Sequence, residues 1–184
     1  LIGLACNCGN EIDVRVHPML VSKSHPISRI DGVLNAVAIE GEPVNRVMFS
    51  GPGAGKFPTA SSVVGDIMMI AHEMDDSDRP LPIMRYDKRR EDAKLKDIKE
   101  TVNKYYLRVT TNNTPGVIGE LGTICGKNGI NLCSVIQKGV FDDGSATIVL
   151  LTEAAQEGNV MKAVEEMAAS PKMRKIGNII RVMD

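Results

Sequence analysis

The chain has 184 residues, of which 43% are hydrophobic and 24% are charged, as in folded proteins with a buried core. This length allows one large domain or two small ones. The formal net charge of -1 argues against a nucleic-acid-binding protein, and no apolar run reaches the roughly 18 residues that a membrane span needs. We therefore expect neither nucleic acid nor membrane as a partner.

Alternating and continuous apolar segments predict strands in the first stretch, residues 1–76. Apolar and charged residues alternate over residues 12–16, as in a half-buried strand. Apolar runs at residues 34–40 and 44–50 flank the turn sequence Gly41-Glu42-Pro43, which predicts a hairpin.

A glycine-rich loop, Gly51-Pro52-Gly53-Ala54-Gly55, follows the hairpin and leads into a helix with Pro58 in its first turn. The loop does not fit a P-loop, because Ser50 stands where glycine is needed. It does not fit a dinucleotide fingerprint either, because Lys56 replaces the third glycine. Small residues before a helix N-terminus can hold a phosphate, a carboxylate or the edge of a cofactor ring, and a plain tight turn is the alternative.

The cysteines and histidines give no sign of a metal site or a catalytic pair. The Cys6-Asn7-Cys8 motif lacks the second ligand pair that zinc would need. In a chain of this size the cysteines suit reduced cytosolic thiols better than a disulfide framework, and they are Cys6, Cys8, Cys125 and Cys133. Structural roles are expected for the histidines, His17, His25 and His72.

The second and third stretches differ sharply in pattern. Residues 77–104 are rich in charge and predict a solvated linker. Residues 105–184 predict the order βαββαβ, a ferredoxin-like arrangement with two helices on one face of an antiparallel sheet. The predicted strands are 105–111, 130–138, 146–152 and 176–183, with a turn at 142–144, one helix from 117 that Gly126 and Gly129 end, and a second helix that Pro171 ends. The fold class is thus α+β, a partial sheet with helices followed by a ferredoxin-like domain.

Several of these motifs together resemble one enzyme family. The run Asn35-Ala36-Val37, the glycine loop and residues 58–67 are similar to the signature near the end of the catalytic region of homoserine dehydrogenases. Residues 15–18 and 25–26 match the same family. Residues 105–108 resemble the opening of its regulatory domain, and residues 112–121 resemble the first strand–helix junction of an ACT domain. The resemblance covers nearly the whole chain.

This resemblance implies the C-terminal part of an enzyme that interconverts homoserine and aspartate semialdehyde with NADP or NAD. The loop residues beside the cofactor would be Gly51, Gly53, Ala54 and Gly55. The dinucleotide fingerprint and the catalytic residues would lie upstream of Leu1, so no catalytic residue is expected in this fragment. Because hydride transfer needs both reactants held together, we expect the fragment alone to be inactive and to bind the cofactor weakly.

For the third stretch, the resemblance implies a pocket for an amino-acid effector, typically threonine, where ACT domains of a dimer or tetramer meet. Exposed amides at a helix start suit the carboxylate of such a ligand, and Gly116 permits a close approach. A helix-capping turn with Asn112 or Thr114 near the N-cap is the structural alternative. The candidate effector site comprises Asn112, Thr114, Pro115, Gly116, Val117, Ile118, Asn131 and Gln137.

Three functional interpretations remain open from the sequence. The first is part of a cytoplasmic homoserine dehydrogenase whose ACT domain senses threonine and couples to activity through the linker. The second is a stand-alone amino-acid-binding module without chemistry of its own. The third is a dimerisation piece, because exposed edges of a partial sheet favour self-association.

Overall fold

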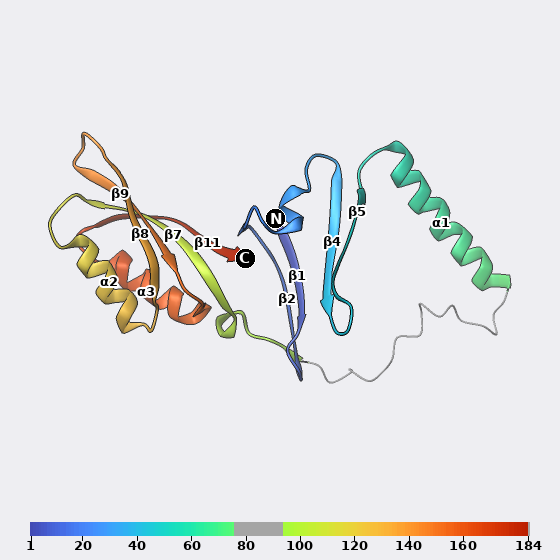
Figure 1. Ribbon diagram of the computed structural model, residues 1–184, viewed down its shortest axis with the longest axis horizontal. Coiled ribbons are helices and arrows are strands. Elements are labelled where there is room, and N and C mark those ends of the chain that lie inside the picture. The colour runs from blue at the N-terminus through green and yellow to red at the C-terminus, as the bar shows by residue number, and fades with distance from the viewer. Residues whose placement is uncertain (76–93, 184) are drawn as a thin grey trace. The chain divides into compact units, whose positions relative to one another are not determined.

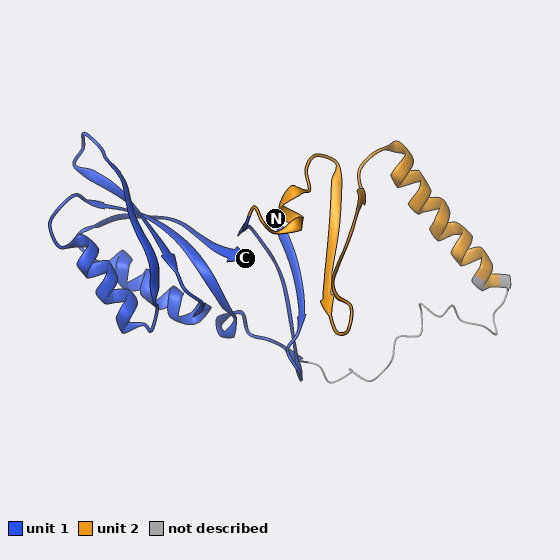
Figure 2. Cartoon of the chain, in the orientation of Figure 1, with its two compact units in different colours: residues 1–22, 93–184 blue, residues 23–92 orange. Residues whose placement is uncertain are grey.

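The computed structural model describes residues 1–75 and 94–183, and Figure 1 shows their helices and strands. These residues form two compact units (Figure 2). The first unit joins residues 1–22 to residues 93–184, and the second spans residues 23–92. The opening strands of the chain therefore share a unit with the C-terminal domain.

The predicted βαββαβ domain is confirmed in the first unit. Its elements are β7 (Val102–Asn112), α2 (Val117–Lys127), β8 (Leu132–Val140), β9 (Ser145–Thr152), the short β10 (Ala155–Gln156), α3 (Glu157–Ala169) and β11 (Met173–Met183). The sheet order is β3-β11-β7-β9-β8, and the helices α2 and α3 lie on one face of this sheet (Figure 1). The α+β fold class is likewise confirmed.

Alternation along the central strands builds the core of this domain. Leu107 and Val109 on β7 point toward the helices, as do Ile148 and Leu150 on β9, and all four are almost completely buried. Both helices contribute apolar side chains to the same cluster, including Leu121, Val160 and Met167. Full burial of such a side chain stabilises the fold by roughly 1.5–3 kcal/mol, so this cluster is the main support of the domain.

Short strands attach the beginning of the chain to this domain. The strands β1 (Ile2–Asn7) and β2 (Glu11–His17) form an antiparallel pair, and β6 (Lys94–Leu95) adds to β2 in parallel. The next strand, β3 (Met19–Val21), pairs in parallel with the end of β11. Chain segments more than 150 residues apart in sequence thus share one sheet, because Met19 lies opposite Arg181.

The second unit contains the predicted hairpin and the helix that follows it. The strands β4 (Leu34–Gly41) and β5 (Asn45–Pro52) pair in antiparallel register along their whole length. The helix α1 (Lys56–Asp75) begins at Lys56, which places Pro58 in the first turn as expected. A 3₁₀ helix at Pro26–Arg29 precedes the hairpin, and His25 caps it by accepting a hydrogen bond from the amide of Ile27.

Gly126 does not end α2 as predicted, whereas the prediction that Gly129 ends this helix is confirmed. Gly126 lies inside α2, and Gly129, with a φ of +69°, follows the end of the helix. The segment predicted as a linker carries structure where it is described, namely β6, a 3₁₀ helix at Ile98–Glu100 and the first residues of β7. The remainder of that linker lies outside the described residues. Among the helices that the structure describes, none is long and apolar enough to cross a membrane.

Candidate functional site

A pocket of about 220 Å³ lies where β7 leads into α2. This volume suits a ligand smaller than the drug-sized molecules that fill pockets of about 300–1,000 Å³. Seven of the eight predicted effector residues line it, together with buried residues of β7 and β9; the seven are Asn112, Thr114, Pro115, Gly116, Val117, Ile118 and Gln137. Asn131 lies directly before Leu132, the first residue of β8, and does not line the pocket.

The first residues of α2 line this pocket. Gly116 is the N-cap in a left-handed conformation, with φ +82° and ψ 0°, and no side chain caps the helix. The structural alternative, a helix-capping turn with Asn112 or Thr114 near the N-cap, therefore supplies no side-chain cap to α2. The first helical hydrogen bond runs from the amide of Glu120 to the carbonyl of Gly116, so the amides of Val117, Ile118 and Gly119 precede it. Such amides, at the positive end of the helix dipole, suit a carboxylate.

A buried hydroxyl adds a second polar group to the pocket. Thr111 is only 1% exposed, and its Oγ1 finds no hydrogen-bond partner among the described residues. Since buried polar groups are rarely left unpaired, this hydroxyl at the floor of the pocket would gain a partner from a bound molecule that reaches it. Sequence reasoning missed Thr111, although its position directly before Asn112 at the end of β7 was a usable signal.

The polar side chains around the pocket are held to different degrees. The Nδ2 of Asn112 donates to the carbonyl of Pro171, and its Oδ1 accepts from Arg174 at 2.6 Å, so Asn112 is fixed by the protein itself. Gln137 donates from Nε2 to Oδ1 of Asn113 at 3.2 Å, which leaves its own carbonyl oxygen free to accept from an ammonium group.

Two positions of the glycine loop in the second unit favour glycine because of packing or backbone conformation within this unit. A Cβ on Gly53 would lie 1.6 Å from the Nδ2 atom of Asn35, and Gly55 has a φ of +127°. Gly51 is different, since a Cβ there would meet no atom within 4 Å. Ala54 completes the turn before α1, which begins at Lys56. The structure thus explains Gly53 and Gly55 by packing and conformation, while the Cβ side of Gly51 is open.

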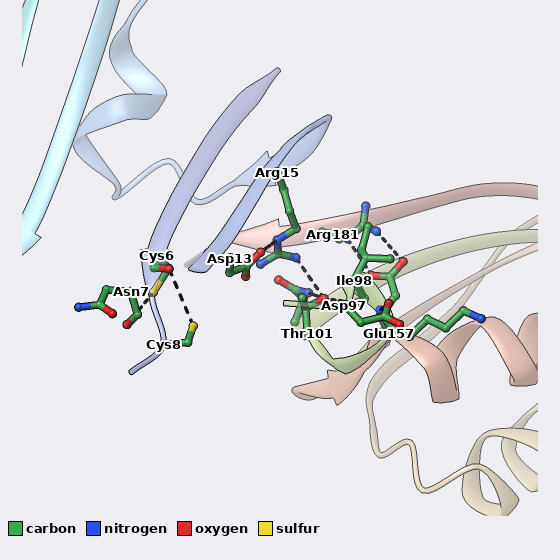
Figure 3. A network of polar contacts seen from close by, with 12 residues as sticks. Cys6, Asn7, Cys8, Asp13, Arg15, Asp97, Ile98, Thr101, Glu157 and Arg181 are labelled. Carbon is green, nitrogen blue, oxygen red and sulfur yellow. Dashed lines mark hydrogen bonds and ion pairs between the residues drawn. The ribbon is translucent and has the colours of Figure 1, made fainter. Parts of the chain in front are cut away.

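A buried polar network joins β2 to the C-terminal domain, and Figure 3 shows its residues. Arg15 pairs with Asp13 at 2.8 Å and donates to Oγ1 of Thr101 at 3.2 Å. Both ion-pair side chains are only 9% exposed. In contrast, Val14 and Val16 on the same strand are exposed. The alternation that predicted β2 was correct, and its charged side is the one that faces the domain.

The network continues into α3 and β11 through Glu157. This carboxylate is buried, accepts from the Tyr105 hydroxyl at 2.6 Å and from Arg181 Nε at 2.9 Å, and pairs with the same guanidinium through its second oxygen. Burial, reinforced by the hydrogen bond to Glu157, raises the pKa of Tyr105 to about 12. None of these residues was predicted, because the contacts join segments distant in sequence.

His17 borders the same network and is buried. Its Nδ1 lies 3.3 Å from the carbonyl of Pro18, which can only accept a hydrogen bond, so Nδ1 carries the proton. Its Nε2 is buried without a partner among the described residues. Burial lowers the pKa of His17, and the nearby charges of Arg181 and Arg15 act in the same direction. His25 caps a 3₁₀ helix and His72 is exposed on α1.

Comparisons with known proteins identify both parts of the chain. The model of the family described as "Homoserine dehydrogenase" matches residues 1–68, and that of the "ACT domain" matches residues 105–169. Homoserine dehydrogenase from Synechocystis sp. is 37% identical over 94% of this chain and 40% of its own length. The enzyme from Neisseria gonorrhoeae is 33% identical over 99% of this chain and 42% of its own length.

A solved structure supports the same assignment. The crystal structure of a homoserine dehydrogenase from Thiobacillus denitrificans matches with a TM-score of 0.86 and 29% identity, over 99% of this chain and 41% of that protein. The chain therefore spans about two fifths of the length of the relatives that it matches. With both segments matched in order and relatives aligned across nearly all of its residues, the chain belongs to the homoserine dehydrogenase family and carries an ACT domain.

Proposed function

We propose that the whole protein containing this chain is a homoserine dehydrogenase that interconverts homoserine and aspartate semialdehyde with NADP or NAD. Family membership over nearly the whole chain supports this assignment. The glycine loop would lie beside the nicotinamide, which supplies the hydride acceptor or donor when it is bound. The open side of Gly51 fits this role, since nothing in the described structure occupies the space that its Cβ would take.

The isolated chain should lack activity, because we assign no catalytic residue to it and place the rest of the reaction site in the remaining length of the protein. The test compares the 184-residue chain with the full-length protein that contains it, by following homoserine-dependent reduction of NADP and of NAD. We expect turnover only with the full-length protein. Absence of homoserine-dependent reduction with both nucleotides would overturn the assignment.

We also propose that the ACT domain regulates the enzyme by binding a free amino acid, threonine, at the junction of β7 and α2. The free amides at the start of α2 carry this inference, because they offer a ready site for the α-carboxylate. The buried hydroxyl of Thr111 and the amide oxygen of Gln137 would accept from the ammonium and hydroxyl groups. The ligand would thus satisfy groups that the protein leaves unpaired.

Titration calorimetry with L-threonine tests this site, using Gln137→Ala and Asn131→Ala as a matched pair. Both positions were expected from the sequence to bind the effector, but only Gln137 lines the pocket. We expect Gln137→Ala to weaken binding by about tenfold, the usual cost of a lost hydrogen bond to a charged group, and Asn131→Ala to leave it unchanged. Equal effects of the two substitutions would place the effector elsewhere.

We further propose that the full-length protein is a cytoplasmic homo-oligomer, a dimer or tetramer. The strand β8 lies at one end of the sheet, and apolar side chains around it are exposed, including Val135, Ile136, Val140 and Phe141. An exposed edge of this kind favours pairing with a second copy. All four cysteines are free, which suits a reducing compartment. Sedimentation equilibrium checks the oligomer, and a monomer at all concentrations would contradict it.

A further inference from the structure

A second hollow lies on the face of the ACT sheet that the helices do not cover. It has a volume of about 410 Å³ and is lined by side chains of β7, β9 and β11. Because Leu107 and Val109 point into the core, the alternating residues Arg108 and Thr110 point to the opposite face. We call this hollow the sheet-face pocket, and its lining is Arg108, Thr110, Phe141, Thr147, Lys175, Gly177 and Asn178.

The backbone of β11 creates the space. The pairing of β11 with β7 shifts register between Ile176 and Asn178, so Gly177 bulges beside Arg108. A Cβ on Gly177 would lie 2.7 Å from the carbonyl oxygen of Arg108 and 3.4 Å from its Nε atom. The bulge therefore accepts only glycine without rearrangement, and the missing side chain leaves room beside the guanidinium group.

The polar side chains that line the sheet-face pocket share one property, which is that none of them has a side-chain partner among the described residues. In the described parts of the chain, no side-chain hydrogen bond or ion pair engages Arg108, Thr110, Thr147, Lys175 or Asn178. Two other cations of the same domain are paired, since Arg174 contacts Asp143 at 2.9 Å and Lys172 contacts Glu120 at 3.1 Å. The lining also contains no carboxylate.

We propose that the sheet-face pocket binds a small organic dianion, either a phosphate monoester or a dicarboxylate. The guanidinium group of Arg108 can donate two parallel hydrogen bonds to an anionic group, and the Lys175 ammonium supplies the second positive charge. Thr110 and Thr147, which lie opposite each other on β7 and β9, add hydroxyl donors. Phe141 offers an apolar wall for the carbon part of the ligand.

This site differs in chemistry from the one proposed for threonine. The pocket between β7 and α2 has no lysine or arginine in its lining and is built from amides and neutral side chains, which suits a zwitterion. The sheet-face pocket offers two cations without a counter-charge and suits a ligand of net negative charge. The two sites can therefore be separated by probe and by variant.

The test is calorimetry on the 184-residue chain at low ionic strength, with inorganic phosphate and malonate as separate probes. Arg108→Gln and Lys175→Gln should each weaken binding by about tenfold, since each removes charge-assisted hydrogen bonds. The control is Lys162→Gln, which makes the same charge change at an exposed position on α3 and should leave binding unchanged. Threonine binding should be unaffected in all three variants.

The relative affinities of the two probes distinguish the two classes of ligand. Tighter binding of phosphate indicates a phosphate monoester, and tighter binding of malonate indicates a dicarboxylate. Arg108 and Lys175 are both exposed, so their variants should keep the fold, which circular dichroism checks. Two results would overturn the proposal: no saturable binding of either probe, or an equal loss of affinity in Lys162→Gln, which would indicate a diffuse effect of net charge.

Discussion

A single carboxylate, Glu157, holds three segments of the first unit together. It receives hydrogen bonds from Tyr105 on β7 and Arg181 on β11, and its own amide donates to the carbonyl of Thr101. Because the Arg181 side chain is only 16% exposed, little water is available to solvate its charge if the carboxylate is removed. Removing one partner of a buried ion pair is costly, since the remaining charge stays desolvated.

We therefore expect Glu157→Gln to lower the free energy of unfolding by about 3 kcal/mol. Urea denaturation followed by circular dichroism measures this loss. Glu165→Gln is the matched control, because Glu165 is exposed on the same helix, and its effect should stay within about 0.5 kcal/mol. Similar stability of the two variants would show that the network contributes little.

The buried His17 should make the folding stability of the protein decrease at acidic pH. Burial lowers its pKa, so the folded protein keeps His17 neutral below pH 6.5, where the unfolded chain begins to take up a proton. The stability that neutral His17 provides is complete above pH 6.5 and is lost as the pH falls toward the lowered pKa. The charged groups around it are Arg15, Arg181 and Glu157.

Thermal unfolding of His17→Gln between pH 7.5 and pH 5 tests this dependence. The variant should lose less stability on acidification than the parent, because no proton is then taken up at this position on unfolding. His72→Gln changes an exposed histidine of α1 and should leave the pH profile of the parent unchanged. Parallel profiles of the parent and His17→Gln would rule out His17 as the source.

Gly116 and Gly126 stand at opposite ends of α2 and should respond oppositely to alanine. Gly116 has a φ of +82°, a conformation that costs other residues about 1–2 kcal/mol, so Gly116→Ala should destabilise the protein by that amount. Gly126 is helical with open space around it, and Gly126→Ala should stabilise by up to about 1 kcal/mol. Melting temperatures of the two variants provide the measurement, and shifts of the same sign would contradict this account.

Elements whose pattern is local could be predicted from the sequence, and elements that depend on distant partners could not. The strands and helices of the ACT domain follow from apolar spacing, as Val160 and Met167 on one face of α3 illustrate. The pairing of β3 with β11 cannot be predicted from a local pattern, because the three residues of β3 pair with residues 181–183 near the other end of the chain. For the same reason the sequence indicated most of the lining of the pocket between β7 and α2 but not Thr111 or the network around Glu157.

The glycine loop between β5 and α1 offers a test at the level of the element. Gly53→Ala should force the exposed Asn35 side chain to move, because the new Cβ would lie 1.6 Å from its Nδ2 atom, and should lower the melting temperature slightly. Gly51→Ala should leave stability unchanged and raise the KM for the nicotinamide cofactor in the full-length enzyme, since only the proposed ligand meets that side. Steady-state kinetics and thermal unfolding of both variants separate the two effects. An unchanged KM in Gly51→Ala would remove this loop from the cofactor site.

At the scale of the whole molecule, effector binding should appear as a gain in stability. A ligand that binds only the folded state stabilises it by about 2.7 kcal/mol at a concentration of 100 times its Kd. We expect L-threonine to raise the melting temperature of the chain in a concentration-dependent manner, and D-threonine at the same concentrations to have a much smaller effect. An unchanged melting temperature with saturating L-threonine would leave the ACT domain with a structural role.

The attachment of β3 limits how copies of the ACT sheet can join. On the β11 side, β3 covers residues 181–183, and the two register shifts of β11 disturb the rest of that border. The β8 side has no further strand beside it among the described residues, although its pairing with β9 shifts register between Leu132 and Ser134 and between Gln137 and Val140. Two copies joined along β8 would leave their partly covered β11 borders facing outward, which opposes the addition of further copies and growth into fibrils.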